Sequence, residues 1–152
     1  MKILIPAILL TLPLTLFANP VPVILGDPFT LGPGQSAEVI GGELYLVFSG
    51  ILSDSRCPHG VECFWEGDAE AAVVGDLPGE IQIPCVLHTS SDYDRFCTMG
   101  IYEVHLLQVD PYPDIEDLPI DPATYLATFV IVEPGPIDLQ PRSWGTLKAL
   151  YR

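Results

Sequence analysis

Basic side chains are scarce in this sequence. Its 6 lysines and arginines stand against 20 aspartates and glutamates, and the formal net charge is −14 at pH 7. A surface of this sign repels the phosphates of nucleic acids and of anionic lipids, so we exclude nucleic acid as a partner. The same acidity favours solubility and can attract cations or a basic protein.

Recognisable catalytic motifs are also missing. The chain contains no G-x-S-x-G, no H-E-x-x-H and no glycine-rich phosphate loop. It has no closely spaced Cys-x-x-Cys pair, and His59, His88 and His105 are too scattered to form a zinc or copper site on one element. Glu103 and His105 are predicted to share one face of a strand, which is typical of a surface ion pair. No residue is therefore predicted to be catalytic, and an enzyme of unrecognised type is only our third hypothesis.

Long apolar runs are confined to the N-terminus. Lys2 precedes an apolar run over residues 3–17, and the small residue Ala18 follows it. This order of charge, apolar segment and small residue predicts a signal peptide over residues 1–18 that is removed on export. The run is shorter than the roughly 20 residues that a membrane-spanning helix needs, and no later segment is long and apolar enough. We therefore expect a secreted or periplasmic protein whose residues 19–152 form a single domain.

All four cysteines follow the predicted signal peptide. An even number of cysteines in an oxidising compartment predicts two disulfides, for which three pairings are possible. We favour the pairing of neighbours, Cys57 with Cys63 and Cys85 with Cys97, because each pair lies in one local segment rich in turn-forming residues. This pairing leaves no free thiol to act as a nucleophile.

Proline and glycine interrupt the chain at short intervals, with 16 of the first and 13 of the second. Such spacing predicts many short strands and little helix, although residues 142–151 fit either a short helix or an edge strand. The predicted strands cover residues 35–40, 43–52, 63–73, 81–88, 100–109 and 124–132. Residues 110–122 contain four prolines and are predicted to form a long surface loop. The predicted fold is an antiparallel β-sandwich of about seven strands, with a small β-barrel as the alternative.

Two of the predicted strands have informative faces. Residues 43–52 are apolar on both faces, which predicts a central strand, with one face formed by Leu44, Leu46, Phe48 and Leu52. Residues 63–73 alternate more cleanly, which predicts a half-buried strand whose outer face carries Glu66, Asp68 and Glu70. Its inner face would include Cys63, Trp65, Ala69, Ala71 and Val73.

Residues 53–73, SDSRCPHGVECFWEGDAEAAV, resemble the central motif of a group of small secreted bacterial proteins. These proteins carry a strand, then D-S-R-C-P, a short loop, V-x-C-x-W-x-G-x-A and another strand. Weaker similarity extends to LGPGQSAEV upstream and to YEVHLLQVDPYP downstream, so the resemblance covers most of residues 19–152. It implies export and a β architecture. The group has no assigned activity, so the resemblance supplies no catalytic residues, and Cys85 and Cys97 are not part of the motif.

In physical terms the motif is predicted to be a structural corner. Pro58 and Gly60 turn the chain, a Cys57–Cys63 disulfide clamps the turn, and Trp65 fills the core beside it. Arg56 is expected to pair with a carboxylate beneath the loop. The alternative is a rigid, exposed tip that binds an extracellular partner, formed by Pro58, His59, Gly60, Val61 and Glu62.

Metal binding is the remaining hypothesis. Carboxylates are the ligands that calcium prefers, and they gather in two predicted loops, one with Asp92 and Asp94 and one with Asp110, Asp114, Glu116, Asp117 and Asp121. No D-x-D-x-D-G loop is present, and a solvated acidic surface is the simpler interpretation. The leading hypothesis is thus an exported, non-enzymatic binding or structural module without a cofactor, and the second is a calcium-binding module.

Overall fold

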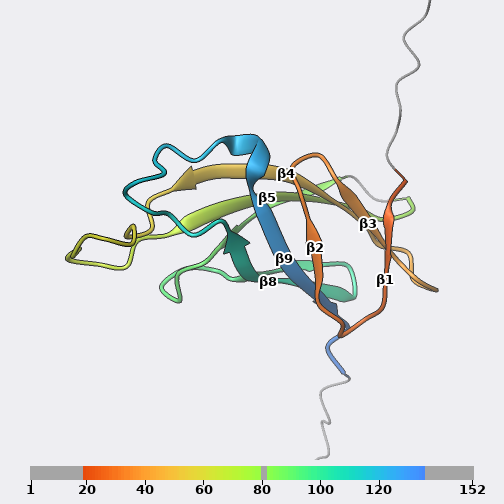
Figure 1. The fold of residues 1–152 in the computed structure, drawn as a ribbon. Coiled ribbons are helices and arrows are strands. Elements are labelled where there is room, and N and C mark those ends of the chain that lie inside the picture. Colours follow the sequence, from red (N-terminus) through yellow and green to blue (C-terminus); the bar gives the residue numbers. More distant parts are fainter. Residues whose placement is uncertain (1–18, 80–81, 136–152) are drawn as a thin grey trace, which may run out of the picture.

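The computed structural model describes residues 19–79 and 82–135, which form two facing β-sheets (Figure 1). The five-stranded sheet has the order β1-β3-β4-β5-β6 and the four-stranded sheet the order β2-β9-β8-β7. The strands are β1 (Val21–Val23), β2 (Phe29–Leu31), β3 (Ser36–Val39), β4 (Tyr45–Asp54), β5 (Ala69–Asp76), β6 (Ile83–His88), β7 (Phe96–Met99), β8 (Tyr102–Asp110) and β9 (Leu126–Val132). A short 3₁₀ helix, η1 (Pro122–Thr124), precedes β9.

The predicted sandwich is confirmed, and the two sheets do not close into a barrel within the described residues. Neighbouring strands are antiparallel except for β1 and β3, which pair in parallel. The described residues contain nine strands, where about seven were expected and six were given residue ranges. The additional strands β1, β2 and β7 are each only three or four residues long, too short to give a clear alternating pattern in the sequence.

The core lies between the sheets and is built from the inward-facing side chains of both. Phe48 of β4 and Phe129 of β9 are fully buried and meet edge to face, with ring centroids 5.6 Å apart. The alternation predicted for β5 is present from Ala69 onward, where every second side chain is buried. The prediction that β4 is a central strand is confirmed, since it lies between β3 and β5.

Two details of the strand predictions are wrong. The strand predicted over residues 63–73 begins only at Ala69, and residues 63–68 belong to a loop. Leu52 does not share the buried face of β4 and is 63% exposed. The reason is that the register with β5 shifts between Phe48 and Gly50 and again between Ile51 and Ser53, and each shift turns the following side chains to the other face.

Both predicted disulfides are present. Cys57 and Cys63 close a loop within the β4–β5 connection, with Cα atoms 5.9 Å apart. Cys85 of β6 and Cys97 of β7 join the edge strands of the two different sheets, so this bridge holds the sandwich layers together. Two disulfides are consistent with an oxidising, extracytoplasmic compartment.

The connections between strands divide the molecule into two ends. Three long loops, residues 55–68, 89–95 and 111–125, gather at one end, which we call the loop end (left side of Figure 1). Short turns over residues 40–44 and 100–101 lie at the opposite end, which we call the hairpin end. The backbone N–H of Glu43 donates to the Tyr102 hydroxyl across the hairpin end, at 3.1 Å.

Two sequence predictions, the signal peptide over residues 1–18 and the element over residues 142–151, fall outside the described residues. Within those described residues, no helix has the length and hydrophobicity to cross a membrane.

Candidate functional site

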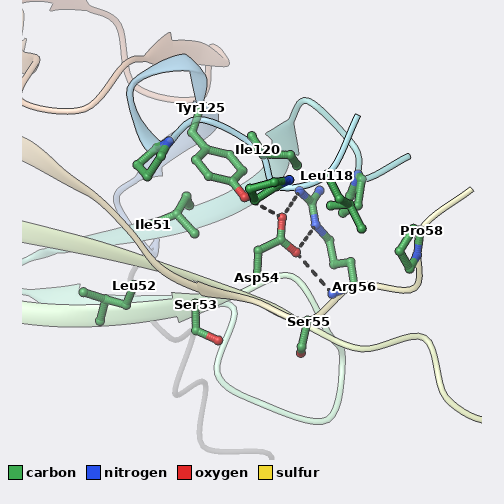
Figure 2. Close-up of a pocket in the computed structure, with 13 residues that line it drawn as sticks. Ile51, Leu52, Ser53, Asp54, Ser55, Arg56, Pro58, Leu118, Ile120 and Tyr125 are labelled. Carbon is green, nitrogen blue, oxygen red and sulfur yellow. Dashed lines mark hydrogen bonds and ion pairs between the residues drawn. The ribbon is translucent and has the colours of Figure 1, made fainter. Parts of the chain in front are cut away.

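Arg56 connects two of the three loops at the loop end. Its side chain is buried and forms a bidentate pair with Asp54, with Nε 2.9 Å from Oδ1 and Nη2 2.6 Å from Oδ2 (Figure 2). Nη1 donates to the carbonyl oxygen of Val109 at 2.6 Å and Nη2 to that of Pro111 at 2.9 Å. The expected pairing of Arg56 with a carboxylate beneath the loop is therefore confirmed. The guanidinium also ties the start of the β4–β5 loop to the end of β8.

Tyr125 belongs to the same network, because it also forms a hydrogen bond to Asp54. Its hydroxyl donates to Asp54 Oδ2 at 3.0 Å (Figure 2). Burial raises the pKa of Asp54, but the hydrogen bonds from Arg56 and Tyr125 outweigh burial and hold that pKa below its usual value. Burial and the hydrogen bond to Asp54 raise the pKa of Tyr125 to about 12. All buried side-chain nitrogen and oxygen atoms among the described residues have hydrogen-bond partners, and those of Arg56 fix the two loops relative to each other.

Gly67 sets the shape of the β4–β5 loop. Backbone hydrogen bonds from Ser55 to Asp68 and from Cys57 to Glu66, at 2.7 and 2.8 Å, keep the two arms of the loop together. Gly67 has a φ of 73°, and a Cβ at this position would lie 1.9 Å from the carbonyl oxygen of Ser55. Only glycine fits both the conformation and the space. This turn ends the alternating pattern that predicted a strand from Cys63.

The predicted binding tip, residues 58–62, is partly attached to the neighbouring loop. His59 exchanges backbone hydrogen bonds with Pro113 and Ile115, at 2.9 and 3.2 Å. Its ring lies against Tyr112 with centroids 4.6 Å apart, and the Arg56 guanidinium lies 4.9 Å from the same Tyr112 ring. His59 therefore attaches the tip to the 111–125 loop, whereas Gly60, Val61 and Glu62 are exposed.

The prediction that Trp65 fills the core is wrong. Trp65 is 76% exposed and its neighbour Phe64 is 99% exposed. The physical reason is the Gly67 turn, which ends the strand alternation and directs the preceding side chains to solvent. Large aromatic side chains thus project from a loop whose backbone is fixed by a disulfide and by hydrogen bonds. The sequence motif identified this loop, but the direction of its aromatic side chains was not predicted.

One hollow at the loop end is lined in part by the network of Asp54, Arg56 and Tyr125 (Figure 2). It has a volume of about 320 Å³ and is open to solvent. Its walls are mostly apolar and come from the end of β4 and from the 111–125 loop, with Ile51, Leu52, Leu118, Pro119 and Ile120 among them. No sequence motif predicted this hollow, because the residues of its two walls are far apart in the sequence.

The acidic residues proposed as calcium ligands are not brought together. Asp114 accepts a hydrogen bond from the Glu116 backbone at 3.0 Å, and Asp121 caps η1 by accepting from Ala123 at 3.0 Å. Asp110 accepts both of its hydrogen bonds from Gln108. Among the residues that the structure describes, Asp92, Asp94, Glu116 and Asp117 join no group of three potential ligands. Several of these carboxylates instead stabilise local turns.

A different cluster could hold a metal ion. Potential ligand atoms of Asp68, Glu70 and His88 all lie within 4.8 Å of one another. Glu70 and His88 are direct partners in the β5–β6 ladder, and His88 Nδ1 lies 2.5 Å from Asp68 Oδ2. The other oxygen of Asp68 accepts from Thr89 and Ser90. Burial raises the pKa of Asp68, but hydrogen bonds from His88, Ser90 and Thr89 outweigh burial and lower it below its usual value.

Sequence reasoning missed this cluster because His88 lies about twenty positions from its two partners. The alternation of Asp68 and Glu70 on one face was noted, but the antiparallel register that places His88 beside them was not. The predicted pair of Glu103 and His105 is confirmed at 3.2 Å, on the other sheet.

No protein-family model, no curated protein and no solved structure matches this chain. The resemblance of residues 53–73 to small secreted bacterial proteins remains a prediction.

Proposed function

We propose that this protein is an exported, non-enzymatic binding module that engages a protein partner through its loop end. The observation that carries this proposal is the combination of exposed apolar side chains with fixed loop backbones. Phe64 and Trp65 project from the disulfide-clamped loop, and Leu118 is exposed on the 111–125 loop.

Exposed aromatic side chains contribute much of the free energy of binding at protein interfaces. Their contribution is larger when the segment that carries them is already ordered, because less conformational entropy is lost on association. At the loop end, the Arg56 network, the Cys57–Cys63 bridge and the His59 contacts supply this order. Loops held on a rigid β scaffold commonly carry recognition, as in other sandwiches.

The experiment compares two double variants in partner capture from the medium or periplasm of the source organism. Phe64→Ser with Leu118→Ser removes exposed apolar side chains from two loops of the loop end. Ile40→Ser with Ile101→Ser removes two comparably exposed side chains from the hairpin end. We expect the first variant to lose the captured partner and the second to retain it. Equal capture by both variants would contradict the proposal.

Metal binding is the second candidate function, supported by the convergence of Asp68, Glu70 and His88. One imidazole and two carboxylates suit a divalent ion of the first transition series better than calcium, which prefers oxygen ligands alone. Thermal melting with zinc, with calcium and with a chelator tests this candidate, because an ion that binds the folded state raises the melting temperature. A zinc-dependent rise that is lost in His88→Gln but kept in His105→Gln would support it. No rise with either ion would exclude it.

A further inference from the structure

A second hollow lies at the loop end, between the 55–68 and 89–95 loops. Its volume is about 230 Å³, and its lining includes two aromatic rings and three carboxylates, those of Trp65, Tyr93, Glu66, Asp68 and Asp92. None of the described residues that line it carries a positive charge. We call it the acidic hollow.

The two aromatic walls of the acidic hollow are exposed to solvent, and the Tyr93 ring is positioned by a neighbouring side chain. Trp65 is mostly exposed, and so is Tyr93 at 60%. The Tyr93 ring lies against the His88 ring, tilted by 31° with centroids 4.9 Å apart, and His88 is in turn held by Asp68. The face of an indole or phenol ring attracts a cation placed over it. Both walls can therefore contribute to binding a positive charge.

The three carboxylates of the acidic hollow differ in how many hydrogen bonds they accept from the protein. Asp68 accepts four hydrogen bonds from the protein, so it has the least capacity left for a donor from a partner. Glu66 accepts one, from Ser90 Oγ at 3.3 Å, which leaves one carboxylate oxygen available. Among the described residues, no group donates a hydrogen bond to the side chain of Asp92. Glu66 and Asp92 are thus available to a ligand that donates hydrogen bonds.

The charge around the hollow identifies the ligand class. Nine of the 20 acidic side chains fall on the three long loops, namely Glu62, Glu66, Asp68, Asp92, Asp94, Asp114, Glu116, Asp117 and Asp121. The basic side chains on these loops are Arg56, which is buried and paired with Asp54, and Arg95. The loop end therefore attracts a basic partner and repels an acidic one.

We infer that the acidic hollow binds one arginine or lysine side chain presented by the partner protein, with Trp65 and Tyr93 against the cation and Glu66 and Asp92 as its acceptors. This inference rests on the proposed function and names the chemistry that the partner must offer. The size of the hollow agrees, because it is smaller than the roughly 300–1,000 Å³ of a site for a drug-sized ligand. It has room for a single long side chain.

The test uses the protein without its signal peptide and with both disulfides intact. Trp144, outside the described residues, is replaced by phenylalanine, so that Trp65 becomes the only tryptophan. The probe is the peptide acetyl-Gly-Arg-Gly-Arg-Gly-amide, followed by Trp65 fluorescence and by isothermal titration calorimetry. The control peptide carries citrulline in place of arginine, which keeps the shape of the side chain and removes its charge. We expect a saturable fluorescence change with the arginine peptide and at least roughly tenfold weaker binding of the citrulline peptide.

Two variants with the same change in net charge separate the hollow from general acidity. Glu66→Gln with Asp92→Asn alters the hollow, and Glu38→Gln with Asp76→Asn alters exposed acids on β3 and β5. By calorimetry, we expect the first pair to weaken binding of the arginine peptide by roughly tenfold or more and the second by less than about twofold. Equal weakening by both pairs, or equal binding of the two peptides, would overturn the inference.

Failure of this inference can be told apart from failure of the proposed function. The capture experiment depends on Phe64 and Leu118, neither of which lines the acidic hollow. If capture requires these two side chains but the arginine peptide does not bind, the loop end binds a partner by other contacts and only the inference falls.

Discussion

The strands of this sandwich are connected by short turns at one end and by long loops at the other. At the hairpin end, turns of a few residues reverse the chain, and the Glu43 backbone donates a hydrogen bond to the Tyr102 hydroxyl of the other sheet. At the loop end, the buried Arg56 and a backbone bridge from His59 join the 55–68 loop to the 111–125 loop, and the Cys57–Cys63 disulfide closes the 55–68 loop internally. A short turn loses little conformational entropy on folding, whereas long loops need contacts that offset the cost of ordering them. This difference between the two ends supports the proposal that the loop end is the binding surface.

The first test of this comparison is a substitution of Arg56, for which we expect the largest loss of stability. Replacing Arg56 with methionine leaves the Asp54 carboxylate buried without its ion pair and removes donors from two carbonyl groups. Loss of one partner of a buried pair costs roughly 3–5 kcal/mol. We expect urea denaturation to show a fall of that size in the free energy of unfolding. The exposed Arg95→Met variant, as a control, should change it by less than about 0.5 kcal/mol.

Two glycines with similar backbone angles offer the second test. Gly67 at the loop end has a φ of 73° and Gly79 beyond β5 has a φ of 80°, but only the first has another atom in the way of a Cβ. Gly79→Ala should cost only the left-handed backbone penalty of roughly 1 kcal/mol. Gly67→Ala should cost roughly 3 kcal/mol or more, because the arms of the loop must also separate. Similar losses in thermal or urea unfolding would show that the loop end yields more easily than we infer.

The third test compares the two disulfides. Cys57–Cys63 orders one loop, whereas Cys85–Cys97 joins the two sheets. Removing a bridge by paired Cys→Ser substitutions restores entropy to the unfolded chain, by an amount that grows with loop length. The sequence separations of 6 and 12 predict losses of roughly 2 kcal/mol for Cys57–Cys63 and roughly 3 kcal/mol for Cys85–Cys97. We expect loss of the first bridge, and not of the second, to weaken partner capture. The reverse result would place the functional surface away from the loop end.

The smallest expected effect is the change in folding stability at low pH. Asp54 and Asp68 both belong to the loop end, and in both the folded protein lowers the carboxylate pKa. A lowered pKa stabilises the folded state above the unfolded value of about 3.9, and this contribution is lost as the pH falls through the folded value. Urea midpoints measured from pH 6 to pH 2.5 should therefore fall less steeply for Asp68→Asn than for the unchanged protein. An unchanged slope for Asp68→Asn would contradict this prediction.

Predictions from the sequence succeeded where one local segment carried the whole signal. The sandwich, the central position of β4, both disulfides and the Glu103–His105 pair all follow from alternation or from spacing within a short stretch. The pairing of Arg56 with a nearby carboxylate is of the same kind, because its partner Asp54 is only two residues away.

They failed where the chain departs from regular alternation. Trp65 was placed in the core by extending the β5 pattern backwards through Gly67, whose positive φ ends it. Leu52 was placed on the buried face of β4 because the two register shifts in that strand have no clear sequence signature. Local backbone irregularities of this kind reverse the face of every residue beyond them.

The sequence by itself determined the acidity of the protein, the pairing of each cysteine with its neighbour in the sequence, and the β architecture. Composition, short-range spacing and periodicity decide these properties. Only the tertiary structure decided what the loop end displays. The acidic hollow draws Glu66 and Asp92 from two loops, and the Asp68, Glu70 and His88 cluster exists because two strands pair in a particular register. Both depend on how segments far apart in the chain fold against one another, which no local pattern encodes.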